Sequence, residues 1–559
     1  MPGGLMQLTG FGAQNILVNG NPSTSYFVKM YKRSTNFAME HFPLQPSFIT
    51  DTSLPTVGKK TFQFKVSRYA DLLHDCYLCV NIPDIYSGLH IVNSSTGEAV
   101  PYEFQWVRNL GYNMIEELSV TFNGTSVCNM TGEWMKVKSY LKDDVAQREK
   151  LDQMVGNTPD LYDPANADGR FNQYPNSITT TLNPTPAPSI RGRQLVIPLS
   201  FWFCEEIGQS LPLIALSQSE IFITITLTNI YNLFTCIDVN PTSPTYGQRI
   251  VGNPGNDQLS TISTFLGPSD PAGNPLNTAL FNWNLNPYVE ANYVFLTETE
   301  RAHIAAYERT YLVTETRWAY YENQYGFNDI LLPMYNLCTR VVALFQRSDR
   351  ALLNDWDNYT NWVDPYSPPL QLTTDIIGGT TFYVTGALPQ NNMNSQDILQ
   401  EGRLVFDGKD RFNTKPVSFF RSLENYKFSK GPSNRLPGVN VYSFAWNPDE
   451  ISQPSGSANG SMFNRTSFLY TLLVPPATNI ATPLPPVCVY KNTVFDNNPT
   501  PVSPAILNTP NVNPGDVVTI YPKQTTTPIQ FGGYNSVVYI ESYNFLKVTN
   551  GQANLVFTT

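Results

Sequence analysis

Apolar and polar residues alternate with a period of two along much of the chain. In residues 221–228, IFITITLT, every odd position is aliphatic and threonine fills most even positions. Residues 60–66 repeat the alternation, with Phe62, Phe64 and Val66 on one side. Such alternation is typical of strands that turn one face to a core and the other to solvent. The pattern predicts a β protein.

Residues 118–127 are predicted to form a β-hairpin. The alternation of LSVTF runs into an Asn-Gly pair and resumes in TSV. A two-residue Asn-Gly loop favours a type I′ turn, because both residues tolerate positive φ angles. The resulting register pairs Phe122 with Thr125 and Val120 with Val127, on a common face.

Helical spacing appears in two segments. In the first, apolar residues from Trp134 to Val145 recur at intervals of three and four. This spacing predicts a helix over 132–155, with Gly156 as a suitable stop.

The second helical segment begins at Thr297. This residue can cap a helix while Glu300 reaches back to close a capping box. The small side chains of Ala302, Ala305 and Ala306 suit a short helix that lies close on a sheet.

Three long stretches rich in Asn, Pro and Thr interrupt the strands, at 157–193, 238–286 and 475–522. Loops of this length in compact domains are usually functional or disordered. Proline lowers the entropy lost on ordering, which favours ordered surface loops here. The middle stretch separates two β-rich blocks and is the best candidate for a domain boundary. Each block is long enough for an eight-stranded sandwich, which wraps two sheets around one core.

Composition narrows the class of protein. Charged residues make up 14% of the 559 residues, against about 25% in typical domains, while hydrophobic residues make up 41% and aromatic residues 13%. These values argue against a disordered chain or a coiled coil. The net charge of -10 disfavours nucleic-acid binding, which needs a basic face. We expect a large, loop-rich β protein with much surface destined for burial.

No membrane or secretory segment is predicted. No apolar run reaches the ~18 residues needed to span a bilayer. The first residues, MPGGLMQLTGFGAQ, have neither the basic nor the apolar region of a secretory signal.

The seven cysteines favour a reducing compartment, because they are odd in number and form no dense framework. The one CxxC sequence, Cys76 to Cys79, lies in a predicted strand, where residues three apart point to opposite faces. We expect small buried side chains there, with no metal site, no redox site and no cofactor. The chain contains four histidines, which are His41, His74, His90 and His303.

No catalytic motif stands out. The sequences GxxxxGK[ST], GxSxG and HExxH are absent. Nothing local marks a histidine as a base, and we interpret His74 and His303 as structural or exposed. Adjacent acidic residues diverge on strands and on helices, so they do not form the converging pair that a glycosidase uses. We interpret these pairs as solvated charges, namely Glu116-Glu117, Asp143-Asp144 and Glu205-Glu206.

Six Asn-x-Ser/Thr sequences are possible glycosylation sites. Asn123 is one of them, and its predicted turn already explains it. In a chain rich in Asn and Thr many such triplets arise by chance. The remaining candidates are Asn93, Asn129, Asn358, Asn459 and Asn464.

Several blocks of sequence are left without a chemical explanation. Residues 3–40 contain a GAQ, a GNP and the ending TNFAME. The next blocks are WVRNLGYNMIEELSV at 106–120, GEW at 132–134 and IPLSFWFCEEIGQSLPLIAL at 197–216.

Further blocks follow in the second half. They are Glu300-Arg301 with Tyr311-Leu312, DGKDRF at 407–412, PGVNVYSFAWNP at 437–448, QPSG at 453–456 and YNFLKVTNGQANLVF at 543–557. Together and in this order, the blocks resemble the major capsid proteins of nucleocytoplasmic large DNA viruses, of the giant and algal virus type.

The resemblance implies an all-β fold of two consecutive eight-stranded jelly-roll β-sandwiches with short accessory helices and long surface loops. It implies a structural protein that forms homotrimers of pseudo-hexagonal outline and tiles the icosahedral shell of a large double-stranded DNA virus. We expect an N-terminal arm at 1–24, a first jelly roll at 25–236 and a second at 237–559, which includes the insert 238–286.

The resemblance also implies partners. These are other copies of the chain, neighbouring capsomers, and minor capsid and penton proteins, with an inner membrane layer reached only indirectly and no direct nucleic acid. The arm over residues 2–20 would lie beneath the capsomer, and loops at one end of the sandwiches would form an outward tower. The expected location is the virion capsid, after assembly in the host cytoplasm.

A β-sandwich carbohydrate-binding or glycoside-hydrolysing viral surface protein is the main alternative. In this interpretation Trp356 and Trp362, in NDWDNYTNWVDPYSPP, are exposed loop residues that stack on sugars. Contacts within a capsomer explain the same aromatic residues. A scaffold protein built on the same fold is a third interpretation.

Overall fold

The computed structural model describes the chain over the following residues, to which all structural statements refer: 3–10, 12–19, 22, 25–29, 33–47, 51–55, 57–93, 98–101, 103–171, 173–177, 179, 181–182, 184–237, 249–251, 262–268, 283–350, 354–362, 365–366, 374–377, 380–383, 395–474, 487–490, 517–520 and 533–557. Within these ranges, no helix combines the length and the apolar character needed to cross a bilayer.

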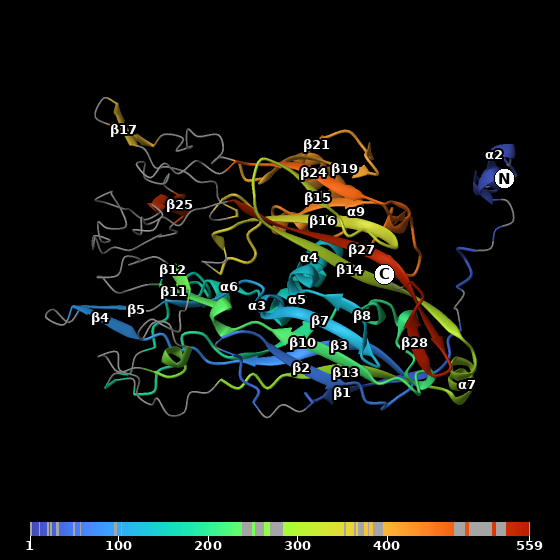
Figure 1. Cartoon of the computed structure of the whole chain (residues 1–559), viewed down its shortest axis with the longest axis horizontal. Coiled ribbons are helices and arrows are strands. Elements are labelled where there is room, and N and C mark those ends of the chain that lie inside the picture. The colour runs from blue at the N-terminus through green and yellow to red at the C-terminus, as the bar shows by residue number, and fades with distance from the viewer. Residues whose placement is uncertain are drawn as a thin grey trace.

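Two four-stranded antiparallel sheets form the first sandwich (Figure 1). Their strand orders are β1-β13-β3-β9 and β2-β10-β7-β8. The predicted alternation is confirmed in β10, where the aliphatic residues are buried and the residues between them are half-buried. The strands are β1 (Phe37–Leu44), β2 (Lys60–Lys65), β3 (Leu72–Ile82), β7 (Ile115–Phe122), β8 (Thr125–Met130), β9 (Arg193–Pro198), β10 (Ile221–Leu227) and β13 (Tyr288–Leu296).

The second sandwich repeats this arrangement. Its sheets have the orders β14-β27-β16-β22 and β15-β24-β19-β20. In both sandwiches the last strand, β13 or β27, lies between the first and third strands, so the predicted double jelly roll is confirmed. The strands are β14 (Arg309–Gln324), β15 (Phe327–Leu331), β16 (Leu337–Arg347), β19 (Leu399–Phe406), β20 (Lys409–Asp410), β22 (Asn440–Ser443), β24 (Thr466–Leu472) and β27 (Tyr534–Thr549), extended by β21 (Lys415–Pro416), β23 (Ala458–Asn459) and β28 (Gln552–Leu555).

The first sandwich extends beyond the boundary predicted at residue 236. Its last strand, β13, pairs with β1 and β3. The stretch 238–286 therefore precedes the last strand of the first sandwich instead of linking two domains. Where the structure describes this stretch, Phe265 packs against Phe104, and the Trp283 indole donates to the carbonyl oxygen of Asn81. We propose that the boundary lies just after Leu296.

Two helices replace the single one predicted over 132–155. They are α4 (Gly132–Lys142) and α5 (Val145–Val155), and Asp144 caps the second with a complete capping box. The pair of aspartates breaks the helix because a cap residue takes an extended backbone. The predicted stop is confirmed, since Gly156 has a φ of 74°.

Helix α7 (Glu298–Ala306) forms where it was predicted, but its details differ. Thr297 occupies the N-cap position without a side-chain hydrogen bond, so the capping box is absent. Ile304 is the buried residue of this helix. The three alanines are exposed, so the predicted packing of their side chains on a sheet is wrong.

The hairpin over β7 and β8 has the predicted turn and a different register. Asn123 and Gly124 have φ angles of 49° and 84°. Phe122 pairs with Thr125 as predicted, but a β-bulge then shifts the strands, so that Val120 faces Cys128. The bulge places one extra residue in β8.

The other elements lie mainly toward the ends of the molecule. Hairpins β4–β5, β17–β18 and β25–β26 lie at one end of the long axis, and α2 lies beyond the opposite end (Figure 1). Most of 475–522 falls outside the described residues. Further elements are α1 (Gly3–Thr9), α2 (Ala13–Asn19), α3 (Leu110–Met114), α6 (Pro159–Tyr162), α9 (Glu424–Phe428), β4 (Leu89–Asn93), β5 (Glu98–Pro101), β6 (Phe104–Trp106), β11 (Phe234–Ile237), β12 (Arg249–Val251), β17 (Thr374–Ile377), β18 (Thr380–Tyr383), β25 (Val487–Tyr490) and β26 (Val517–Ile520).

Strand β16 is buried on both faces. Val341 and Phe345 enter the core of the second sandwich. Val342 and Leu344 enter a core shared with the first sandwich. The sheet that contains β16 therefore joins the two sandwiches.

Replacing Gly132 by alanine should destabilise the chain by about 1–3 kcal/mol or more. An added Cβ would overlap the carbonyl oxygens of Tyr112 and Ile115, against which α4 begins. Gly208→Ala is the matched control, since a Cβ there meets no atom within 4 Å. Urea unfolding compares both variants with the wild type. Equal stability of Gly132→Ala and wild type would contradict the close packing of α4.

Candidate functional site at the junction of the two sandwiches

Helix α4 of the first half lies against the second sandwich (Figure 1). The ring of Trp134 stacks on that of Tyr539 in β27, with centroids 5.1 Å apart. Val137 and Leu141 share a hydrophobic core with Leu344 of the second sandwich. We call the contact of α4 and its neighbours with the second sandwich the junction.

A chain of buried ion pairs crosses the junction. Arg340 lies 2.8 Å from Asp449 and 2.7 Å from Glu541. Glu541 in turn lies 3.1 Å from Lys138 of α4, which lies 2.5 Å from Glu205. The side chains of these five residues are each at most 7% exposed. Each buried charge thus meets at least one opposite charge.

The ion pairs control the protonation of their members. Burial by itself would raise the pKa of Glu541, but attraction from Arg340 and Lys138 lowers it below its ordinary value. For Lys138, burial alone would lower the pKa, and the carboxylates of Glu205 and Glu541 raise it. Both residues are therefore held in their charged forms.

Asp357 anchors a second buried cluster. Its Oδ1 atom lies 2.6 Å from Lys136 Nζ, and the Asn109 amide donates to its Oδ2 atom at 2.6 Å. Asn113 donates to the same carboxylate at 3.0 Å. Burial would raise the pKa of Asp357, but Lys136 and these hydrogen bonds lower it.

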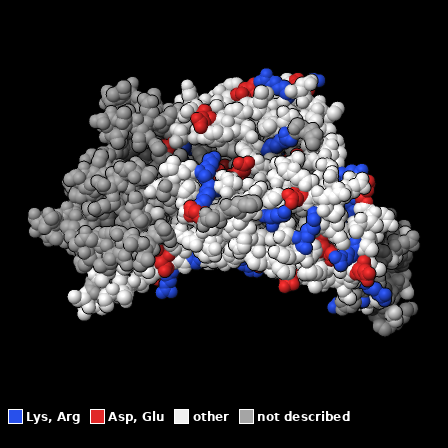
Figure 2. Space-filling view, turned by 60° about the horizontal axis from the view of Figure 1, so that its bottom comes forward, with Lys and Arg blue, Asp and Glu red and all other residues white. Residues whose placement is uncertain are grey.

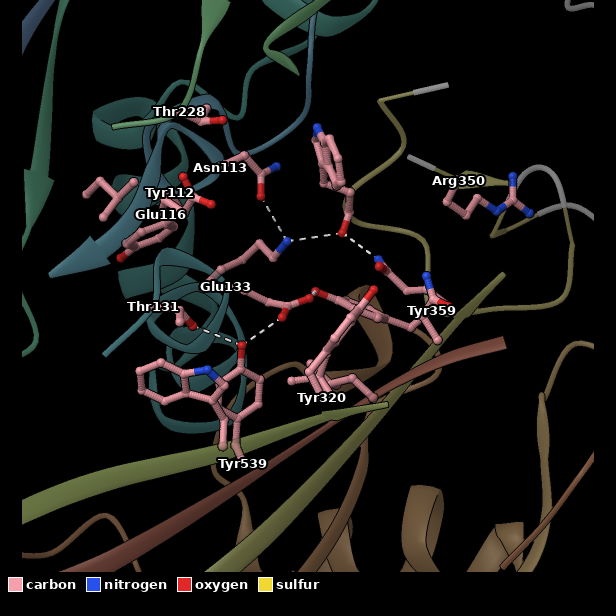
Figure 3. Close-up of a pocket in the computed structure, with 18 of the residues that line it drawn as sticks. Tyr112, Asn113, Glu116, Thr131, Glu133, Thr228, Tyr320, Arg350, Tyr359 and Tyr539 are labelled. Carbon is pink, nitrogen blue, oxygen red and sulfur yellow. Dashed lines mark hydrogen bonds between the residues drawn. The ribbon is translucent and has the colours of Figure 1, made fainter. Parts of the chain in front are cut away.

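Glu133 joins two tyrosines of the second half (Figure 3). The hydroxyls of Tyr359 and Tyr539 donate to its two oxygens at 2.8 Å and 2.7 Å. Burial, followed by the charge of Glu133, raises the pKa of both tyrosines. The phenols therefore remain hydrogen-bond donors.

The segment 354–361 attaches the second half to the first. The Asn354 amide donates to the carbonyl oxygens of Tyr231 and Phe234 at 2.5 Å and 2.9 Å. The Trp356 indole donates to the carbonyl oxygen of Asn232 at 2.8 Å. Trp356 is half-buried against the shared core, so its predicted exposure as a sugar platform is wrong.

A cavity of about 400 Å³ lies between these groups. Asn113, Glu133 and Lys136 line it from the first half, and Tyr359, Tyr539 and Arg347 line it from the second. Figure 3 shows Glu133 and Tyr539 in the lining of this cavity, pointing toward one another. The acidic groups here are engaged by cations or phenols, an arrangement that holds two domains in place.

The cysteines and histidines considered for metal or redox chemistry lie in different environments. Cys76 and Cys79 are buried, as predicted. His74 is buried against the carbonyl oxygen of Phe203, and His303 is exposed. Within the described ranges, no group of three or more His, Cys, Asp or Glu residues is arranged to hold a metal ion.

The interpretation of Glu205 as a solvated charge is wrong. Its side chain is 7% exposed and binds both Lys138 and Lys142. Its partners lie more than 60 residues away in sequence, and Glu541 lies further still, so no local signal marked them. The buried cations Lys136, Lys138 and Arg340 were missed for the same reason.

The candidate glycosylation residues differ in exposure. Asn459 and Asn464 are exposed, and Asn129 is half-buried and donates to Glu117. Asn358 is fully buried and donates to Asp355, which leaves its amide inaccessible in the folded chain. Asn93 ends β4, and its side chain lies outside the described residues. Glycosylation at Asn459 and Asn464 stays a prediction.

Two family models match the chain in succession. One, described as the major capsid protein N-terminus, matches residues 25–266. The other, described as the large eukaryotic DNA virus major capsid protein, matches residues 300–495. The chain belongs to this family of major capsid proteins. It is therefore a structural component of the virion capsid and not an enzyme, as the resemblance implied.

Named relatives agree with this assignment. Probable capsid protein 4 of Acanthamoeba polyphaga mimivirus is 32% identical over 244 residues, which are 43% of this chain and 40% of the relative. The major capsid protein of Phaeocystis pouchetii virus is 25% identical, over 84% of this chain and 93% of the relative. A chain of the PBCV-1 virus capsid matches with a TM-score of 0.57 and 17% identity, over 96% of this chain and 100% of its own. The similarity to the chain of the PBCV-1 virus capsid shows a shared fold.

Replacing Lys138 by methionine should destabilise this capsid protein by about 3–5 kcal/mol, because it removes one partner from a buried ionic chain. Lys547→Met is the matched control, since its ion pair with Glu308 is largely exposed and should contribute little. Chemical denaturation measures both variants. A Lys138→Met variant as stable as the control would refute a stabilising role for the chain of ion pairs.

Acid should weaken the junction. The pKa values of Glu541 and Asp357 lie below their ordinary values of 4.5 and 3.8, so the stabilisation is present above those values and is lost as the pH falls through the lowered pKa. In the variant Glu541→Gln/Asp357→Asn, the free energy of unfolding should fall less steeply with decreasing pH below 4.5. Urea titrations over a pH series test this. An unchanged slope would show that these carboxyls do not govern acid stability.

Proposed function

We propose that the chain forms a homotrimer of pseudo-hexagonal outline, which tiles the icosahedral shell of a large double-stranded DNA virus. The observation that carries this proposal is the repetition of one strand order in two joined sandwiches. Three copies with two similar bodies each supply six similar corners, and hexagons fill a surface. A rigid junction keeps the two bodies in one relative orientation.

The surface chemistry supports extensive self-association. Figure 2 shows broad uncharged areas on one face, with basic and acidic side chains scattered among them. Only 14% of the residues are charged. Surfaces that become protein interfaces are depleted of charge at their centres and rich in aromatic residues.

The two ends of the molecule suggest two directions in the shell. We propose that the end with β4–β5, β17–β18 and β25–β26 forms the outward tower. The arm over residues 2–20 would then lie beneath, against minor capsid proteins or neighbouring capsomers. Penton proteins and an inner membrane layer, contacted only indirectly, complete the proposed partners, without direct nucleic acid, and assembly takes place in the host cytoplasm.

Light scattering of the purified chain should give the mass of three copies, and electron microscopy should show particles with a pseudo-hexagonal outline. A monomer, or a trimer of another outline, would overturn the proposal. Copy number in purified virions separates a shell protein, which dominates by mass, from a scaffold with the same fold.

A further inference from the structure

An aromatic segment before β1 is exposed to an unusual degree. Tyr26 and Phe27 are 101% and 99% exposed, and Val28 is 59% exposed. Their side chains therefore gain almost nothing from their own subunit. Exposed aromatic groups of this size are normally covered by a partner.

A groove of about 570 Å³ lies elsewhere on the same chain. One wall is β8 of the first sandwich, and the other walls are β14, β28 and the residues just after it. Val127, Trp318 and Leu555 give it apolar lining, and polar residues such as Ser126 and Asn554 lie among them. Because its walls come from both halves, the groove exists only while the junction holds the two sandwiches together.

The groove also offers a strand edge. β8 is the last strand in the order β2-β10-β7-β8, so one of its edges has no hydrogen-bonded partner in that sheet, and β14 of the second sandwich lies close beside β8. Such an edge accepts an extended segment through backbone hydrogen bonds, while apolar pockets take alternate side chains. In the single subunit residues 26–28 form a turn, so docking at the edge requires them to extend, a conformation that Tyr, Phe and Val favour.

We propose that residues 26–28 of one copy occupy this groove on a second copy. Figure 1 shows β8 and β28 toward the end of the long axis beyond which the arm extends. Copies standing side by side would therefore hold the arm and the groove at similar heights. The eight residues between Val28 and the start of β1 let the segment reach at most about 30 Å from that strand, enough to pass the edge of a subunit. This inference rests on the proposed self-association and names one contact within it.

Mixed oligomers of two differently tagged chains test the exchange. One chain carries Phe27→Cys and the other Ser126→Cys, and oxidised glutathione supplies the oxidant for a disulfide between them. The cross-linked pair of different chains should be about tenfold or more abundant than in the control, because docking raises the effective concentration of the two thiols. The control pairs Phe27→Cys with Leu182→Cys, a comparably exposed position at 97%. Wild-type oligomers give the background from native cysteines.

Each outcome is decisive. Oligomers that form with no more cross-link than the control overturn the exchange and leave the trimer standing. A double variant, Phe27→Cys/Ser126→Cys, that cross-links only within single chains shows that each segment covers its own groove, which also overturns the proposal. If light scattering finds only monomers, the proposed trimer fails first and the exchange fails with it.

Discussion

Charge can be buried between two domains only when opposite charges meet there, because an unpaired buried ion costs several kcal/mol. This condition governs the junction. Lys138 of the first half forms an ion pair with Glu541 of the second half, and Glu541 also forms an ion pair with Arg340. A small rotation of one sandwich against the other would separate Lys138 from Glu541. The relative orientation of the two halves is therefore tied to the pairing of charge as well as to apolar contact.

The apolar part of the junction depends on one sheet that serves two cores. β16 directs alternate residues into its own sandwich and into the core shared with α4. Antiparallel sheets commonly leave one face to water, so a sheet buried on both faces marks a place where domains join. The close start of α4 at Gly132 brings Trp134 onto Tyr539 and completes that contact.

Local features were predictable, and distant pairings were not. The alternation in β10, the turn at Asn123 and the stop at Gly156 depend on neighbouring residues, which the sequence displays directly. The β-bulge, the late position of β13 and the burial of Glu205 depend on partners far along the chain. Motifs in a fixed order indicated the family, but the junction that unites the two sandwiches left no such local mark.

The late position of the last strands has a consequence for folding. β13 follows β10 after a stretch that begins at residue 228, and β27 follows β24 after one that begins at residue 473. Each last strand must then insert between two strands that come much earlier in the sequence. Doubling such a loop costs only about 0.6 kcal/mol of closure entropy, so long insertions there are thermodynamically cheap. Pairing over such separations in sequence is slow, however. Until β13 or β27 pairs, the two strands on either side of it have no hydrogen-bonded neighbour between them.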